Sequence, residues 1–228
     1  QHLAAYSIVS GSMQNPALPF EINALGTLNI LEAMKNSKVP LLIFSSSASV
    51  YGISSDGLIN EGTETHPINP YGESKLMAER LIFWYHKAHG IRSLSLRYFN
   101  AAGATKRNGE SHSPETHLIP SLLAAAISGN TVPIFGSSFA TPDGTAIRDF
   151  VHVSDIASAH VSAMEQADSF QCATVNLGTN QGSSVREVIE TVENITGKKL
   201  QIELQEARSG DPPILVARNA LAMKILGW

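Results

Sequence analysis

The chain has 228 residues, a net charge of −4 and 43% hydrophobic residues, which is enough apolar material to bury a sizeable core. The charge gives no sign of nucleic-acid binding, and a single cysteine, Cys172, excludes an internal disulfide framework and a cysteine-rich metal site. No apolar run is long enough to span a membrane, and the first residues lack the layout of a signal peptide. We therefore expect a soluble, cytoplasmic protein with no membrane partner.

Helical and extended patterns alternate along the chain. Helices are predicted over residues 18–36, 71–88, 118–128, 153–166 and 185–196, and strands over residues 41–46, 93–97, 132–135 and 174–177. Residues 100–116 are polar and contain glycine and proline, so they are predicted to form a loop. The alternation of strands and helices predicts an α/β protein with a parallel sheet.

Tyr71 and Lys75 are separated by one helical turn, which places a phenol and an ammonium on the same face of a helix. Asn69 is a suitable N-cap and Pro70 suits the first helical position, so Tyr71 is expected in the first turn. A nearby positive charge favours a phenolate, so this pair can supply a general base. Taken alone, such a pair is more often a solvated face of a surface helix.

A buried strand precedes this helix and ends in Ser45, Ser46 and Ser47. In a doubly wound sheet, ligands bind beyond the carboxyl ends of the strands. The three hydroxyl groups are therefore expected near the start of the Tyr71 helix. A polar turn that satisfies backbone groups is a reasonable alternative for Ser45 and Ser46, whereas Ser47 is assigned to chemistry.

Four segments, 45–52, 69–75, 96–100 and 143–153, resemble in sequence and order the motifs of the extended short-chain dehydrogenase/reductase family, and the likeness covers nearly the whole chain. The chain looks most like the family members that epimerise UDP-hexoses at C4. The resemblance implies a Rossmann-like doubly wound parallel sheet, NAD as cofactor and a 4-keto intermediate. It assigns Tyr71 as the base at the sugar O4 hydroxyl and Ser47 as its partner on that oxygen. Lys75 would bind the nicotinamide ribose and lower the Tyr71 pKa.

The same resemblance implies further contacts for the cofactor and for a UDP-sugar. The implied cofactor residues, besides Tyr71 and Lys75, are Ser45, Asn23, Tyr98 and Phe99. The implied substrate residues, besides Ser47, are Asn100, His117, Leu118, Phe135, Arg148, Arg208 and Asp211. The arginines would hold the diphosphate and Asp211 the uridine ribose. For Asn23, Phe99, Leu118 and Phe135, a role in packing is at least as good an interpretation.

The remaining histidines give weaker signals. His152 lies in an apolar segment and is expected to be a hydrogen-bonded core residue. His112 and His117 belong to a loop that resembles the family's substrate-entry region, where they could contact the nucleotide. No cluster in the sequence supports a metal.

The resemblance also divides the chain. Residues 1–100 and 147–178 correspond to the C-terminal half of an NAD-binding domain, and residues 101–146 and 179–228 to a nucleotide-sugar-binding portion. No glycine-rich dinucleotide fingerprint is found, and residues 2–5 resemble the end of a fourth strand, so the first strands are expected upstream and the chain is expected to be truncated at both ends. On this interpretation the isolated chain binds NAD poorly.

Several alternatives stay open. Ala48 and Ser49 stand where a sugar 4,6-dehydratase needs an acidic pair, which argues against dehydration. Epimerisation of a UDP-N-acetylhexosamine or a UDP-uronate, or a non-catalytic nucleotide-sugar-binding fragment, remains possible. Apolar residues on more than one face of the helices at 18–36 and 71–88 favour a homodimer.

Overall fold

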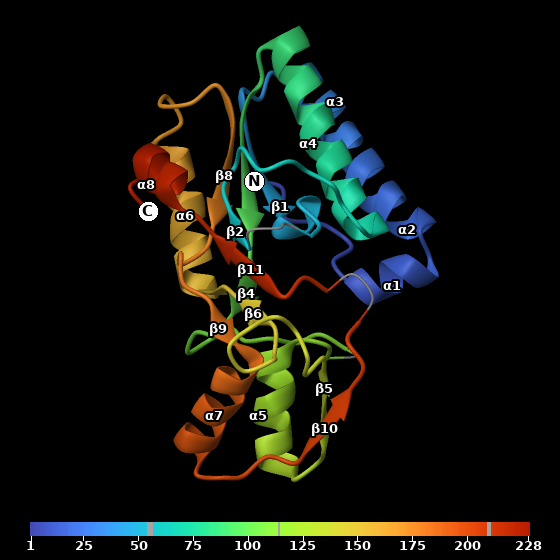
Figure 1. The fold of residues 1–228 in the computed structure, drawn as a ribbon. Coiled ribbons are helices and arrows are strands. Elements are labelled where there is room, and N and C mark those ends of the chain that lie inside the picture. Colours follow the sequence, from blue (N-terminus) through green and yellow to red (C-terminus); the bar gives the residue numbers. More distant parts are fainter. Residues whose placement is uncertain (54–56, 114, 209–210) are drawn as a thin grey trace.

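The computed structural model describes residues 1–53, 57–113, 115–208 and 211–228. Its central sheet contains three parallel strands, β1 (Leu41–Ser47), β3 (Arg92–Tyr98) and β8 (Cys172–Leu177), in the order β1-β3-β8 (Figure 1). A parallel bridge between His2 and Phe44 extends the sheet beyond β1. The predicted α/β class with parallel strands is confirmed.

Helices cover both faces of this sheet, because successive residues of a strand point to opposite sides. Ile43 packs in a cluster with α6 (Val153–Glu165) and α8 (Ala220–Leu226), whereas its neighbours Leu42 and Phe44 pack in a second cluster with α3 (Gly26–Asn36) and α4 (Pro70–His89). Figure 1 shows the two pairs of helices on opposite sides of the strands. This is the layering of a doubly wound sheet.

Helix α4 begins and ends where the local signals predict. The side chain of Asn69 accepts a hydrogen bond of 2.8 Å from Gly72 N, and Pro70 occupies the first turn, where a missing N–H group costs nothing. The helix ends at Gly90, whose φ of 70° suits a residue without a side chain. Tyr71 is therefore fixed in the first turn.

The helical segment predicted at 18–36 is confirmed in extent but is not uniform. It follows α1 (Val9–Gln14) and consists of α2 (Ala17–Pro19), a π-helical stretch (Phe20–Leu25) and α3. In the π-helical stretch, the carbonyl of Asn23 accepts the Thr27 hydroxyl at 2.6 Å. Widened turns of this kind often occur at functional sites.

A second, smaller cluster lies at the other end of the molecule (Figure 1). Helices α5 (Leu118–Ser128) and α7 (Val185–Thr196) pack against the parallel pair of β5 (Val132–Phe135) and β10 (Ile202–Gln205). Short strands join the two ends of the molecule. They form a four-stranded sheet of β2 (Leu58–Ile59), β11 (Ile214–Ala217), β6 (Ile147–Arg148) and β9 (Ser183–Ser184), and a pair of β4 (Asn100–Ala102) and β7 (Phe150–His152).

The proposed division of the chain stays a prediction, and α8 and β11 pack across it: Ala217 of β11 packs with Val50 and Leu76. Helix α8 falls within residues 179–228, which were assigned to the nucleotide-sugar portion, but its Ala222 and Leu226 pack in the cluster of β8. We therefore propose that the last helix belongs by packing to the NAD-binding portion.

Two local expectations are wrong. The predicted loop at 100–116 starts with β4, which pairs with β7. His152 is exposed rather than in the core, because β7 ends there and α6 begins: its Nδ1 accepts a hydrogen bond of 3.2 Å from Ser154 N and caps the helix. Among the described residues, no helix combines the length and the apolar character needed to cross a bilayer.

Candidate active site

The carboxyl end of β1 meets the first turn of α4. Ser47 is the last residue of β1, and its hydroxyl accepts a hydrogen bond of 3.1 Å from Ser49 N at the start of a 3₁₀ turn (Ala48–Val50). Gly72 of α4 packs directly against this turn, since a Cβ at Gly72 would be 2.4 Å from Ser49 O. The absence of a side chain at Gly72 thus allows Tyr71 to approach Ser47.

Tyr71 is partly buried beside the Ser47 hydroxyl. Burial raises the pKa of Tyr71, and hydrogen bonding with Ser47 opposes this rise. Lys75 is not among the groups that shift the pKa of Tyr71 in this structure, so the lowering by Lys75 stays a prediction. The ammonium of Lys75 is turned toward β1 and does not offset the cost of burying the phenolate.

Lys75 is 3% exposed and is anchored to the strand that carries Ser47. Its Nζ donates a hydrogen bond of 2.8 Å to Ser45 O and lies 5.0 Å from the centre of the Phe44 ring. Burial lowers the pKa of Lys75 to about 8, against the opposing effect of the Glu79 carboxylate. The side chain is therefore a buried cation close to its own titration range.

Glu79 belongs to a buried ion pair that sequence reasoning missed. Arg97 on β3 donates two hydrogen bonds to the carboxylate, 2.9 Å from Nε to Oε1 and 2.6 Å from Nη2 to Oε2, and Ser46 donates a third of 2.5 Å. Both partners of the pair are less than 10% exposed, at 7% and 9%. The sequence signal for this ion pair was Arg97, a charged residue inside an apolar strand. The pair locks α4 against β1 and β3.

A chain of polar side chains runs from β1 across β3 to α6. The hydroxyl groups of Ser45 and Tyr98 are 2.8 Å apart, and Tyr98 also bonds to Nε2 of His160. Burial raises the pKa of Tyr98 to about 12, the Ser45 hydrogen bond opposes this, and nearby Tyr71 adds to it. His160 was not foreseen as part of the site. It is buried, and its Nδ1 finds no partner among the described residues.

Two other residues assigned to the cofactor are used within the chain. The Asn23 amide donates to Tyr6 O and Ser74 Oγ at 3.0 and 2.8 Å, and its carbonyl accepts from Tyr6 N at 2.8 Å. Phe99 is 7% exposed and packs with Leu76. For both, the structure corresponds to the packing alternative.

The residues assigned to the nucleotide form two contacts near β6 and β5. Arg148 lies 3.8 Å from the Asp211 carboxylate and donates a hydrogen bond of 2.8 Å to Pro212 O. Burial lowers the pKa of Arg148, and the charge of Asp211 opposes this effect. The Arg208 guanidinium is 4.0 Å from the centre of the Phe135 ring. Ser209 and Gly210, which link Arg208 to Asp211, lie outside the described residues.

The other predicted substrate residues lie on different elements. Asn100 is partly buried at the start of β4, where its backbone N donates a hydrogen bond of 2.9 Å to Asp149 O. Leu118 packs against the α5 and α7 cluster, so the packing alternative fits it. His117 precedes α5 and is exposed, and its ring lies 5.0 Å from that of His112.

A nicotinamide cofactor can be tested against this donor set. A lysine ammonium has three N–H donors, and within the described part of the chain Lys75 uses one of them, on Ser45 O. A buried cation with free donors at the carboxyl end of a parallel strand fits the hydroxyl groups of a ribose. The residues present therefore fit the nicotinamide ribose end of a dinucleotide.

A parallel, doubly wound sheet with a serine at a strand end, and a tyrosine and a lysine in the helix that meets it, defines a class of nicotinamide-dependent enzymes. A family model described as the NAD dependent epimerase/dehydratase family matches residues 1–178, and the chain belongs to this family.

The most informative relatives share one name. The UDP-glucose 4-epimerase of Lactobacillus helveticus is 44% identical over 231 residues, covering 100% of this chain and 70% of the relative. The crystal structure of UDP-glucose 4-epimerase from Brucella ovis in complex with NAD matches with a TM-score of 0.95 and 43% identity over 100% of this chain and 71% of that one. The enzyme from Bifidobacterium longum in complex with NAD+ and UDP matches with a TM-score of 0.93 and 36% identity over 100% and 70%.

Proposed function

We propose that the protein is an NAD-dependent isomerase that interconverts UDP-glucose and UDP-galactose at C4. The observation that carries this proposal is the packing of the Tyr71 turn onto the Ser47 segment, with Lys75 anchored 2.8 Å from Ser45 O. Its relatives at 44% identity carry the name UDP-glucose 4-epimerase, which favours UDP-hexoses over N-acetylated or uronate sugars.

The reaction requires inversion at a carbon whose C–H bond is not acidic, so direct removal of that proton is implausible. A bound NAD⁺ would supply a hydride acceptor that takes the C4 hydride and returns it to the opposite face. Tyr71 would accept the O4 proton as the ketone forms and give it back as the alcohol is restored. Ser47, whose hydroxyl already faces the phenol, would hydrogen-bond the same oxygen and hold it in place.

Lys75 would hold the ribose of the cofactor with the donors that Ser45 does not use. The raised pKa of Tyr71 means that its phenolate needs positive charge nearby in the working complex. In the working complex Lys75, one helical turn away on α4, would supply this charge, whereas in this structure its ammonium is hydrogen-bonded to Ser45 O and does not shift the pKa of Tyr71.

The nucleotide end of the substrate would bind at β5, β6 and the start of α5. Arg148 and Arg208 carry guanidinium groups, whose planar donors suit diphosphate oxygens. Asp211, 3.8 Å from Arg148, would accept hydrogen bonds from the uridine ribose. Asn100, His117, Leu118 and Phe135 would complete the pocket.

A labelling experiment tests the proposed reaction. UDP-galactose carrying deuterium at C4 should yield UDP-glucose that retains the deuterium, because the hydride leaves and returns without exchange with water. Mass spectrometry of the product measures this. Loss of the label to solvent would contradict the redox route and indicate proton abstraction from carbon.

We also propose a cytoplasmic homodimer that pairs α3 and α4 between protomers. Phe83 and Trp84 on α4 are 43% and 65% exposed, and Ile22 and Leu25, just before α3, are also exposed. Large exposed apolar side chains are a feature of protein interfaces. A Trp84→Lys variant that sediments as wild type would contradict this interface.

A further inference from the structure

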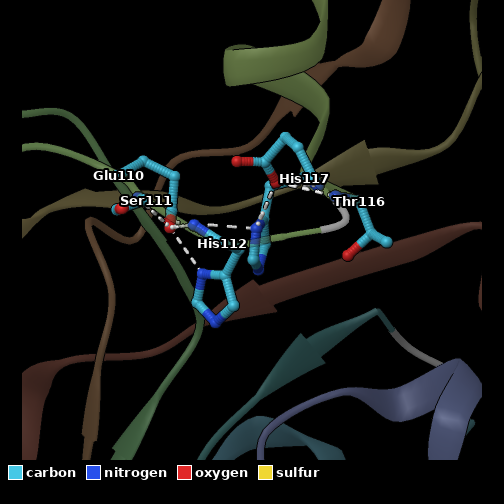
Figure 2. Close-up of polar contacts among 6 residues, drawn as sticks. Glu110, Ser111, His112, Thr116 and His117 are labelled. Carbon is cyan, nitrogen blue, oxygen red and sulfur yellow. Dashed lines mark hydrogen bonds and ion pairs between the residues drawn. The ribbon is translucent and has the colours of Figure 1, made fainter.

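Two histidines and a glutamate converge on the segment just before α5, outside the proposed site of the reaction. Their ligand atoms, one each from Glu110, His112 and His117, all lie within 4.8 Å of one another. His112 Nδ1 is 2.5 Å from Glu110 Oε1, and His117 Nδ1 is 3.8 Å from Glu110 Oε2. In Figure 2 the imidazole rings of His112 and His117 lie beside the Glu110 carboxylate, and dashed lines join them to it.

The backbone holds the carboxylates in place. Glu110 Oε1 accepts hydrogen bonds from Ser111 N and His112 N at 2.8 and 3.0 Å. Glu115 Oε1 accepts from Thr116 N and His117 N, each at 2.7 Å, and contacts His117 Nδ1 at 2.8 Å. These hydrogen bonds fix the positions of the two carboxylates on the segment before α5.

We propose that Glu110, His112 and His117 bind a divalent transition-metal ion such as Zn²⁺. Imidazole nitrogen and carboxylate oxygen together suit zinc and its neighbours rather than Ca²⁺ or Mg²⁺, which prefer oxygen ligands.

The spacing of the cluster fits such an ion. Tetrahedral ligands at zinc bond lengths lie about 3.4 Å apart, and the observed separations of 2.5 and 3.8 Å fall on either side of this value. The side chains are partly exposed, at 35% for Glu110, 41% for His112 and 47% for His117, so they can adjust and an ion can enter from solvent. Solvent supplies the fourth ligand.

The position of the cluster gives the ion a structural consequence. Glu110 and His112 belong to an irregular segment, whereas His117 directly precedes α5. An ion bound to all three ties this segment to the start of the helix. None of the three ligands touches Tyr71, Lys75 or Ser47 in the described contacts, but His117 is also proposed for the nucleotide end of the substrate pocket, so a bound ion would lie at the edge of that pocket.

Calorimetric titration of the full chain with ZnCl₂ tests the proposal directly. We expect saturable binding of one ion per chain, with an affinity that falls about tenfold or more in Glu110→Gln and in His112→Gln. Glu110→Gln keeps the shape of the side chain and lies on an exposed segment, so its fold can be verified by circular dichroism. Co²⁺ in place of Zn²⁺ should give absorption bands typical of nitrogen and oxygen ligands.

A matched control comes from a second pair of the same kind. His66 Nε2 lies 3.0 Å from Glu64 Oε2 in an exposed pair to which the described residues add no third ligand. His66→Gln should leave zinc binding unchanged. The proposal is overturned if the wild-type chain does not bind zinc saturably, or if Glu110→Gln and His112→Gln bind it as the wild type does.

Discussion

The ammonium of Lys75 lies 2.8 Å from the carbonyl oxygen of Ser45, two residues before Ser47 on β1. This hydrogen bond joins the helix that carries Tyr71 to the strand that carries Ser47. The bond is buried, so water does not compete for it. The relative position of phenol and hydroxyl therefore depends on Lys75 as well as on Gly72.

Replacing the ammonium should reduce turnover. We expect Lys75→Met to lower kcat for UDP-galactose by about two orders of magnitude or more, because the variant removes a preorganised charge and the donors proposed for the ribose. A coupled assay of UDP-glucose formation measures this. Lys87→Met, on an exposed part of the same helix, is the matched control and should keep wild-type kcat. Equal rates for the two variants would contradict the role of Lys75.

Lys75 should also make stability depend on pH. Its pKa falls from an ordinary value of 10.5 to about 8 on folding, so between these values the unfolded chain binds more protons and stability rises with pH. The contribution gained across this window is about 3 kcal/mol. Urea unfolding at pH 7.5 and pH 10.5 measures it as the difference between wild type and Lys75→Met. If the difference in stability between wild type and Lys75→Met stays constant with pH, the Lys75 ammonium does not have a pKa lowered by burial.

The Arg97 and Glu79 ion pair should be important for stability. Glu79→Gln leaves a buried guanidinium without its counter-charge, and breaking such a pair costs about 3 to 5 kcal/mol in the free energy of unfolding. Glu73→Gln provides the comparison, since the Glu73 and Arg80 pair is 3.8 Å apart and exposed. That change should cost no more than about 0.5 kcal/mol. Chemical denaturation measures the loss in the free energy of unfolding for both variants. Equal losses would refute the prediction.

Gly72→Ala should impair the reaction even though alanine is the better helix former. A Cβ at Gly72 would lie 2.4 Å from Ser49 O, so the turn that carries Tyr71 must move away from Ser47. A displacement of about 1 Å at reacting groups can reduce kcat by about a hundredfold. Gly109→Ala is the control, because its added Cβ meets nothing closer than 3.7 Å. Wild-type kcat in Gly72→Ala would show that close approach is not required.

Local signals were sufficient for the elements that frame the site. Asn69, Pro70 and Gly90 predict the ends of α4, and the apolar run before Ser45 predicts β1, because capping and strand periodicity are properties of short segments. The prediction for His152 failed, since the same segment contains the end of β7 and the cap of α6.

What the sequence could not predict depends on partners distant along the chain. The ion pair of Glu79 and Arg97, with Ser46, forms only when α4 packs on the sheet. The hydrogen bond between Tyr98 and His160 likewise joins a strand to a helix of another layer. The rise that burial causes in the pKa of Tyr71 was not predicted, because the cost of burial depends on neighbours that sequence spacing does not reveal. The grouping of Glu110 with two histidines likewise follows from the path of an irregular segment.

The most direct test of the central claim is the turnover of UDP-galactose by Tyr71→Phe. Removal of the phenolic oxygen eliminates the proposed base, so we expect kcat to fall by about two to four orders of magnitude while the chain remains folded. Tyr85→Phe, which removes a hydroxyl group farther along the same helix, should retain wild-type kcat. If Tyr71→Phe turns over UDP-galactose as fast as Tyr85→Phe does, Tyr71 is not the base and the account is contradicted.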